Sequence, residues 1–325
     1  QAEDGIRDLV RSRGLGDVYK RQLLIGLFFI YLSYQNTTVD DRNNISNYIQ
    51  NADYHFIIIS MLFGLFSHIS RAIRWRYLLV PLGYKPRLAN SILAVLIGYL
   101  SNLGIPRSGE LLRATVMNRY DKIPFEKGFG TVIAERVFDL IILFIFVCLA
   151  LALQFDLIMN TLDFRPFKLL SLLIIILIFG LGIGILVYSK SPLLEKFKFF
   201  LTEIWQGVIS IKKIIKKKPF IFHTLFIWVM YILMFGVIKY SIPETSNLGL
   251  NALIPAFVIG GLSILITNGG IGIYPYTVSL VLISFGISKD SSLAFGWIVW
   301  SCQTLMVLTF GAIAFFALPL INRQR

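Results

Sequence analysis

Residues 102–113 read Asn-Leu-Gly-Ile-Pro-Arg-Ser-Gly-Glu-Leu-Leu-Arg, and residues 135–139 read Glu-Arg-Val-Phe-Asp within a long apolar segment. Charges of both signs, together with residues that break helices, therefore interrupt an otherwise apolar stretch of the chain. Ionisable side chains at membrane depth are costly and are rare unless they pair with each other or serve a function. These two motifs are the first candidates for a functional site.

The composition indicates a membrane protein. The chain has 325 residues, of which 56% are hydrophobic and 15% charged, whereas soluble domains carry about 25% charged residues. The net charge of +13 comes from basic clusters between apolar runs, as the positive-inside rule predicts, so we expect no nucleic-acid partner. The three histidines and two cysteines lack metal-ligand spacing, so we expect no metal and no cofactor.

The first 22 residues do not read as part of the fold. Residues 1–22 resemble a translated sequencing adapter, so we expect them to be non-native and exclude them. Residues 23–34 are then the remnant of a first transmembrane helix, too short for a bilayer that needs about 20 residues. We expect a single integral membrane domain over residues 23–322, with halves at 23–153 and 167–320.

Charge parity assigns a topology to the first half. The basic segments 71–87 and 190–218 are both expected in the cytoplasm. Three apolar segments separate them, at 88–105, 129–153 and 167–188. Because the last two are long and uninterrupted, the first, broken by glycine and asparagine and closed by proline, is predicted to be a re-entrant hairpin that enters from the cytoplasm. Irregular backbone at membrane depth must be buried in protein or line a cavity.

The second half repeats this order. Asn251–Thr267 and Ile273–Ile287 are apolar arms around a glycine turn, and either two crossings or one re-entrant pair fits the parity. The fold class predicted is an all-α polytopic membrane protein with about six full transmembrane helices and two broken hairpins, compatible with an inverted repeat. We expect a multi-pass protein of the bacterial inner (cytoplasmic) membrane with both termini in the cytoplasm.

The long basic segment has a helical apolar stripe. Apolar residues recur at spacings of 3 and 4 within 190–218, with lysines between them. This pattern predicts an amphipathic cytoplasmic linker on an anionic membrane surface. An ordinary solvated loop explains the lysines equally well but not the stripe.

Helix length places the acidic residues inside the bilayer. The uncharged run Leu140–Leu153 covers 14 residues, about 21 Å of helix, which is short of a hydrocarbon core of about 30 Å. Asp139 should therefore lie within the hydrocarbon. Glu135 and Asp139 share a helix face and Arg136 reaches Asp139, which leaves one carboxylate to pair with an arginine from another segment.

The predicted site combines both motifs with the glycine turn of the second half. The candidate substrate-binding residues are Asn102, Arg107, Glu110, Arg113, Glu135, Arg136, Asp139, Asn268, Gly269 and Gly270. Arginine suits phosphate because its planar fork donates two hydrogen bonds at once. The alternatives are a buried salt-bridge cluster that only locks the hairpin to the helix, and a simple glycine turn. Near the end of the preceding span, the residues expected to be interface anchors are Arg71, Arg74, Trp75 and Arg76.

Three motifs in order resemble a known family. They are Arg-Ala-Ile-Arg-Trp-Arg-Tyr-Leu-Leu at 71–79, Asn102 with Pro-Arg-Ser-Gly-Glu-Leu-Leu-Arg at 106–113, and Glu-Arg-Val-Phe-Asp at 135–139. Over roughly residues 23–320 the chain resembles the lysylphosphatidylglycerol synthase transmembrane-region family, also called flippase-like or UPF0104 membrane proteins. Two features depart from the family pattern. Proline and arginine are adjacent at 106–107 where relatives often have Pro-x-Arg, and Ile-Tyr-Pro-Tyr at 273–276 stands where many relatives place a glutamate.

The resemblance implies a function for the membrane domain. It implies a multi-helix inner-membrane protein related to the flippase part of aminoacyl-phospholipid synthases. Those synthases carry a cytosolic domain that transfers an aminoacyl group from tRNA to phosphatidylglycerol, and we do not expect that activity from this chain, which ends at Arg325. We expect a lipid or lipid-linked headgroup flippase. Its expected partners are a phospholipid or lipid-linked substrate and anionic membrane lipids, and a homodimer is compatible with the sequence. The alternatives are a membrane-embedded lipid-modifying transferase and a non-transporting scaffold.

Overall fold

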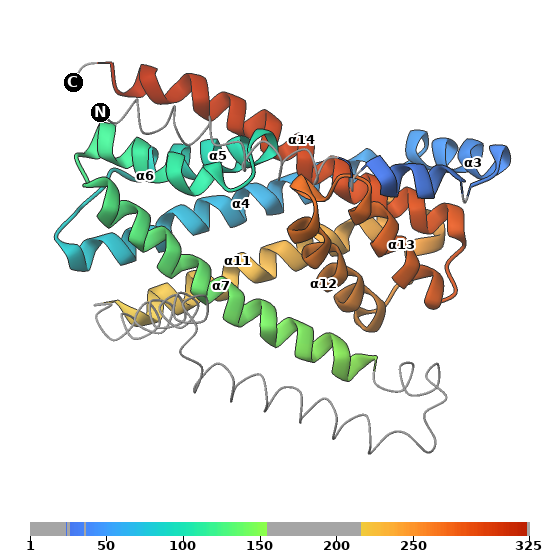
Figure 1. Cartoon of the computed structure of the whole chain (residues 1–325). Helices are drawn as coiled ribbons and strands as arrows, with labels where there is room; N and C mark the ends of the chain where they lie inside the picture. Colours follow the sequence, from blue (N-terminus) through green and yellow to red (C-terminus); the bar gives the residue numbers. More distant parts are fainter. Residues whose placement is uncertain (1–23, 25–26, 36, 155–215, 324–325) are drawn as a thin grey trace, which may run out of the picture.

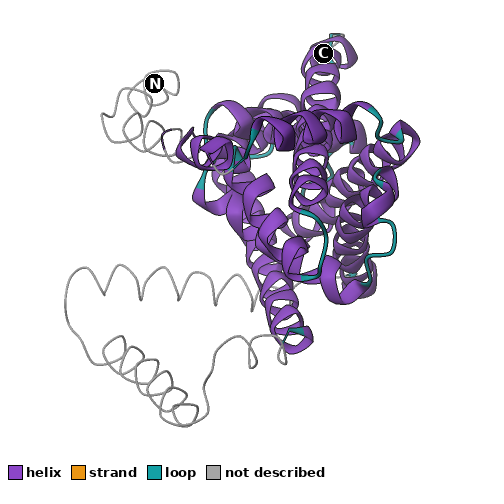
Figure 2. Cartoon of the chain, turned by 90° about the vertical axis from the view of Figure 1, so that its right-hand side faces the viewer, coloured by secondary structure: helices purple, strands orange, loops and turns teal. Residues whose placement is uncertain are grey.

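The computed structural model describes residues 24, 27–35, 37–154 and 216–323, and every regular element in that part of the chain is a helix (Figures 1 and 2). Among the described residues, four helices are long and apolar enough to cross a membrane. They are α4 (Tyr54–Leu79), α7 (Phe125–Leu153), α11 (Lys217–Gly236) and α14 (Lys289–Ile321). The chain is therefore a multi-pass helical membrane protein.

Shorter helices fill the space between these spans. They are α3 (Val39–Gln50), α5 (Leu88–Gly104), α6 (Ser108–Asp121), α12 (Leu250–Ile266) and α13 (Ile273–Ser284), with the 3-10 turns η1 (Val80–Leu82), η3 (Val237–Ser241), η4 (Pro243–Thr245) and η5 (Asn268–Gly270). Helices α5 and α6 pack together as one hairpin, and α12 and α13 as another. The predicted crossing at 167–188, most of the linker at 190–218 and the segment 1–22 lie outside the described residues.

The first hairpin differs from the prediction. We expected breaks within 88–105, but α5 is helical throughout and the chain turns at Ile105–Arg107, with α6 as the returning arm. Asn102 does not break α5, because its side-chain oxygen accepts a 2.7 Å hydrogen bond from the Gly109 backbone N–H at the start of α6. The motif at 106–113 therefore lies at the tip of the hairpin and along its second arm, and not at its exit.

The two hairpins meet at their tips. In Figure 1 the α5–α6 hairpin lies to the left and the α12–α13 hairpin to the right, with both turns near the middle of the molecule. A Cβ added at Gly269 in the second turn would lie 3.6 Å from the Leu103 side chain near the first turn. The order span, hairpin, span occurs twice, and the second set runs in the opposite direction, as Figure 1 shows.

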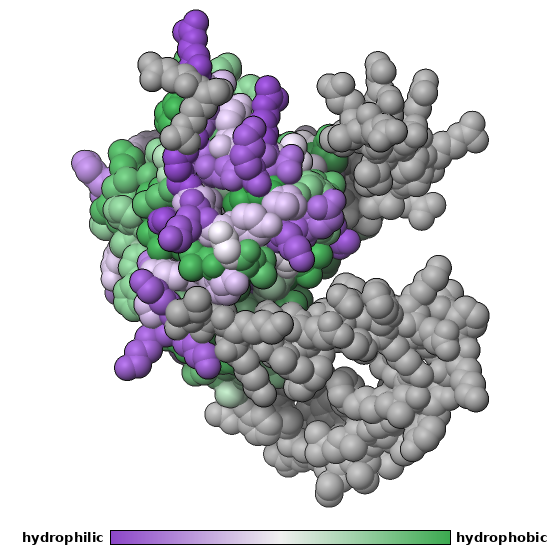
Figure 3. Space-filling view, turned by 90° about the vertical axis from the view of Figure 1, so that its left-hand side faces the viewer, coloured by the Kyte–Doolittle hydropathy of each residue, from purple (hydrophilic) through white to green (hydrophobic). Residues whose placement is uncertain are grey.

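Charge divides between the two ends of the spans. The left-hand end of Figure 1, which faces the viewer in Figure 3, gathers hydrophilic side chains. The basic residues of the connections at this end are Lys85, Arg87, Arg119, Lys122, Lys127, Lys216, Lys217 and Lys218. The acidic residues of the opposite end are Asp40, Asp41, Asp53, Glu244 and Asp290. That end also carries the described basic residues Arg42, Lys239 and Lys289, and the basic end also carries Asp121 and Glu126, so the basic residues outnumber the acids at one end only. This asymmetry is what the positive-inside rule predicts for the two sides of a membrane.

Small residues allow the helices to approach closely. A Cβ on Gly296 of α14 would lie 2.6 Å from the Pro275 carbonyl oxygen, and one on Gly311 would lie 2.6 Å from the Leu100 side chain. Such contacts are typical of helix packing in membranes, where van der Waals fit replaces the hydrophobic effect. Helix α14 therefore holds both hairpins in place along its length.

Glu244 joins η4 to the start of α14 and gives a pH-dependent contribution to stability. It accepts hydrogen bonds from the Ser288 N–H (2.7 Å), the Ser288 hydroxyl (2.6 Å) and the Ser291 hydroxyl. Partial burial raises the pKa of Glu244, but these hydrogen bonds outweigh burial and hold the pKa below its ordinary value of 4.5. A carboxylate with a depressed folded-state pKa stabilises fully above the unfolded value, and this stability is lost as the pH falls through the folded value.

We therefore expect the thermal unfolding midpoint of the detergent-solubilised protein to fall as the pH drops below about 4.5, and Glu244→Gln to remove part of that fall. Glu126→Gln, at an exposed position at the basic end, is the matched control and should leave the profile unchanged. Identical profiles for wild type and Glu244→Gln would contradict the prediction.

Candidate functional site

Three arginines from two elements converge on one buried carboxylate. Glu135 of α7 accepts hydrogen bonds at Oε1 from Arg71 Nη1 (2.7 Å) and Arg74 Nη2 (3.0 Å), both on α4. Its Oε2 accepts one from Arg113 Nη2 of α6 (2.7 Å). The Glu135 side chain has no exposed surface, so the cluster joins a span, a hairpin arm and a second span in the protein interior.

Asp139 completes the cluster one turn along α7. Its carboxylate lies 2.5 Å from Arg71 Nη1 and 2.9 Å from Arg74 Nη2. Spacings of three residues on α4 and four on α7 bring both pairs onto facing helix surfaces. Asp139 lies halfway along α7, one of the helices long and apolar enough to cross a membrane.

The cluster carries surplus positive charge. The three arginines Arg71, Arg74 and Arg113 face two carboxylates, which leaves a formal charge of +1. The Nε atom of each of these arginines is buried without a hydrogen-bond partner. Surplus charge and unused donors in the interior favour an anionic ligand, because unpaired buried charge is destabilising.

A polar aromatic layer adjoins the cluster. Arg71 Nη2 donates to the Tyr231 hydroxyl (3.2 Å), which lies 3.3 Å from the Tyr99 hydroxyl. The Tyr99 ring packs on His68, with 4.1 Å between ring centres, and both ring nitrogens of His68 are buried without a hydrogen-bond partner. The sequence prediction missed these three residues, although His68 lies on the same face of α4 as Arg71, three positions earlier.

The Trp75 ring packs against the Arg113 guanidinium. Its indole N–H donates to the Thr131 hydroxyl (2.8 Å), and the Arg113 guanidinium lies 4.3 Å from its ring centre. The structure thus buries Arg71, Arg74 and Trp75 in the protein interior, whereas interface anchors would expose these side chains at the surface. Arg76 is half-buried near the end of α4.

The remaining predicted residues lie at the rim and at the tips. Arg136 Nη2 and Glu110 Oε1 form an ion pair of 2.7 Å between α7 and α6. Arg107 is exposed at the tip of the first hairpin, with a left-handed φ of 63° that a side chain resists. It makes no ion pair with any described acid.

The glycine turn of the second half is also at a tip. Gly269 and Gly270 have φ of 64° and 75°, which favour glycine. The Gly269 carbonyl accepts a 2.8 Å hydrogen bond from the Trp300 indole. This turn, which begins at Asn268, faces Leu103 of the first hairpin, so the structure brings the two hairpin tips together. The glycine turn is not part of the arginine cluster.

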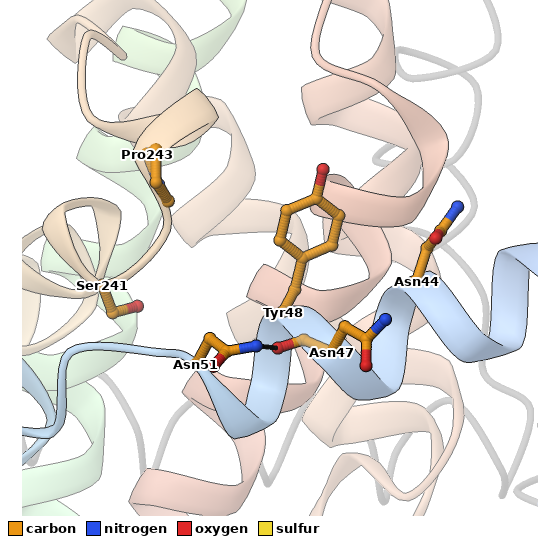
Figure 4. Close-up of a pocket in the computed structure, with 6 residues that line it drawn as sticks. All are labelled: Asn44, Asn47, Tyr48, Asn51, Ser241 and Pro243. Atoms are coloured by element: carbon orange, nitrogen blue, oxygen red, sulfur yellow. Dashed lines mark hydrogen bonds between the residues drawn. The ribbon is translucent and has the colours of Figure 1, made fainter.

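A hollow elsewhere in the molecule is less suited to an ionic substrate. A hollow of about 260 Å³ at the acidic end is lined by Asn44, Asn47, Tyr48, Asn51, Ser241 and Pro243 (Figure 4). No charged side chain lines it. Among the residues that the structure describes, no group of three histidine, cysteine or acidic side chains could hold a metal ion.

Comparisons with known proteins agree with the motifs. The family described as "Lysylphosphatidylglycerol synthase TM region" matches residues 22–311. The chain is 31% identical to the glycosyltransferase AglD of Haloferax volcanii over 102 residues, which are 31% of this chain and 16% of that protein. It is 29% identical to a UPF0104 membrane protein of Methanocaldococcus jannaschii over 99 residues, 30% of each. The matched region thus spans less than a third of either relative, and no solved structure matches.

Proposed function

This chain belongs to the lysylphosphatidylglycerol synthase transmembrane-region family, and from that premise we propose that it moves a phosphate-bearing lipid or lipid-linked headgroup between the leaflets of the membrane. The observation that carries the proposal is the buried cluster of three arginines and two carboxylates, with its surplus positive charge and unused donors. Ionisable groups within membrane-spanning helices often mark substrate pathways.

The arrangement of the helices supports a transport role. Transporters built from inverted repeats place the substrate near the bilayer midplane, beside interrupted helices at equivalent positions of the two halves. Here two hairpins of opposite direction touch at their tips, and the arginine cluster lies beside the first of them. In the proposed topology both hairpins are re-entrant, the basic end and both termini face the cytoplasm, and the protein lies in the inner membrane.

In this proposal the arginines and the carboxylates of the cluster have different roles. The arginine forks hold the phosphate, and the carboxylates keep the arginines paired while no lipid is bound. The rim pair Glu110–Arg136 stands between the cluster and the surface, with 37% of the Arg136 side chain exposed. Arg107 is exposed at the hairpin tip and makes no ion pair with a described acid, so its guanidinium is available to an anionic headgroup that reaches the middle of the protein.

Arg107 allows a test that leaves the buried cluster intact. Arg107→Gly removes the guanidinium. It also places glycine, which adopts a positive φ without strain, at a left-handed position, so the variant should fold at least as well as wild type. We expect lipid transfer to slow by about tenfold, the value of one charged hydrogen bond of about 1.5 kcal/mol. The measurement is transfer of acyl-labelled phosphatidylglycerol between leaflets of proteoliposomes, read by chemical quenching of the outer leaflet.

Lys122→Gly is the matched control. Lys122 also has a left-handed φ, 56°, but ends α6 at the basic end of the molecule, away from the hairpin tip. It should transfer lipid at the wild-type rate. If Arg107→Gly and Lys122→Gly transferred lipid at equal rates, Arg107 would have no part in the transport pathway. If vesicles with the wild-type protein transferred lipid no faster than protein-free vesicles, the transport proposal would be refuted.

A membrane-embedded transferase is the second candidate, because one relative is named a glycosyltransferase. The shared region is 16% of that protein, so the name alone does not bring its activity to this chain. A transferase produces a new lipid species that mass spectrometry detects in membrane extracts, whereas a flippase changes only the distribution between leaflets.

A further inference from the structure

The two carboxylates of the cluster differ in how firmly they are held. Glu135 uses both oxygens, is bound by three arginines, and has 0% exposed side-chain surface. Asp139 contacts two arginines, retains 12% exposed surface, and its Oδ1 lies near Arg74 without making a hydrogen bond. Glu135 is thus the fixed anion of the cluster, and Asp139 is held less completely.

Charge counting says what could take the place of Asp139. If its carboxylate moved away from Arg71 and Arg74, the three arginines would face Glu135 alone with a formal charge of +2. A phosphate group that carries one negative charge would restore the present value of +1. Phosphate also offers several acceptor oxygens, which the unpaired Nε atoms of both arginines and the nearby Tyr231 hydroxyl could satisfy.

We propose that Asp139 is an exchangeable counter-ion, which holds Arg71 and Arg74 in the empty protein and is displaced when a monoanionic phosphate group binds them. This inference rests on the proposed function, because it assumes that the cluster receives substrate. The phosphate is a lipid diester or free phosphate, and both share the chemistry that the arginines recognise. In either case Asp139 competes with the ligand and thereby favours release.

If Asp139 is exchangeable, removing its charge should strengthen phosphate binding, whereas removing one partner of a purely structural ion pair should not. Asp139→Asn removes the competing charge, so phosphatidylglycerol should bind about tenfold more tightly, as expected when a charged hydrogen bond of about 1.5 kcal/mol no longer opposes it. The measurement is lipid occupancy of the purified full chain by native mass spectrometry, with phosphatidylglycerol, diacylglycerol and inorganic phosphate as separate probes. Diacylglycerol lacks the phosphate and should show no gain.

Two variants serve as controls. Asp290→Asn makes the same chemical change at a half-buried position of the acidic end, where the side chain accepts a hydrogen bond from Asn44, and it should leave occupancy unchanged. Asp139→Glu keeps the negative charge and should bind no more tightly than wild type. A gain with phosphatidylglycerol alone assigns the site to the lipid diester, and a gain with inorganic phosphate as well assigns it to the phosphate group itself.

The remaining outcomes are equally decisive. If Asp139→Asn is recovered folded only when phosphatidylglycerol is present, phosphate replaces the carboxylate as proposed. Unchanged or weaker binding by folded Asp139→Asn, or failure to fold with and without phosphatidylglycerol, overturns the exchange. Wild-type transfer in proteoliposomes separates this failure from failure of the proposed function, because transport can persist without an exchangeable Asp139.

Discussion

Glu135→Gln is expected to destabilise the folded protein by about 3–5 kcal/mol, the loss measured when one partner of a buried ion pair is removed. The glutamine keeps the shape of the side chain but withdraws the charge that holds Arg71, Arg74 and Arg113 together. These arginines would then share the single charge of Asp139, which contacts only two of them. Arg113, with no other acidic partner among the described residues, would be left unpaired over Trp75.

Unfolding of the detergent-solubilised variant, followed by chemical denaturation or by loss of the monodisperse peak on heating, measures this cost. Glu110→Gln is the matched control, since it removes a carboxylate from a rim pair whose arginine is 37% exposed. Such partly solvated pairs contribute about 1 kcal/mol or less. If both variants lost the same stability, the arginine cluster would not be the anchor of α4, α6 and α7.

Much of this site could be predicted from residue type and helix length. The uncharged run after Asp139 is too short to span the bilayer alone, which predicted that this charged turn belongs to the spanning helix, and the structure places Asp139 halfway along α7. Glu135 and Asp139 share one face of α7, which predicted that an arginine from another segment would be needed, and Arg71, Arg74 and Arg113 fill that role. The predicted pair of Arg136 with Asp139 is wrong, because Arg136 pairs with Glu110 of α6 instead.

What could not be predicted depends on contacts between separate helices. The polar character of His68, Tyr99 and Tyr231 is visible in the sequence, but their proximity arises only when α4, α5 and α11 pack together. Likewise the sequence predicted that Asn102 would break a helix. In the structure it caps the start of α6, and that role depends on a backbone N–H seven residues away. Local helix propensity does not predict such partners, because they come together only through tertiary packing.

The hairpin itself gives the second large effect: Gly109→Ala is expected to separate α5 from α6 and to abolish lipid transfer. An added Cβ would lie 2.1 Å from the Gly98 carbonyl oxygen and 2.7 Å from its carbonyl carbon, both backbone atoms. Because backbone cannot rotate away as a side chain does, the arms must move apart. That movement breaks the 2.7 Å hydrogen bond from the Gly109 N–H to Asn102. Overpacking and loss of a helix cap together cost about 2–4 kcal/mol.

The same movement would withdraw Arg113, one turn further along α6, from its 2.7 Å contact with Glu135. Gly104→Ala is the control within the same hairpin, because a Cβ there meets nothing within 4 Å. It should raise stability by about 0.5–1 kcal/mol, as alanine does in a helix, and leave transfer intact. Thermal unfolding and proteoliposome transfer of both variants test this. A stable, active Gly109→Ala protein would show that the hairpin arms tolerate separation, and that the close crossing at Gly98 does not hold Arg113 against Glu135.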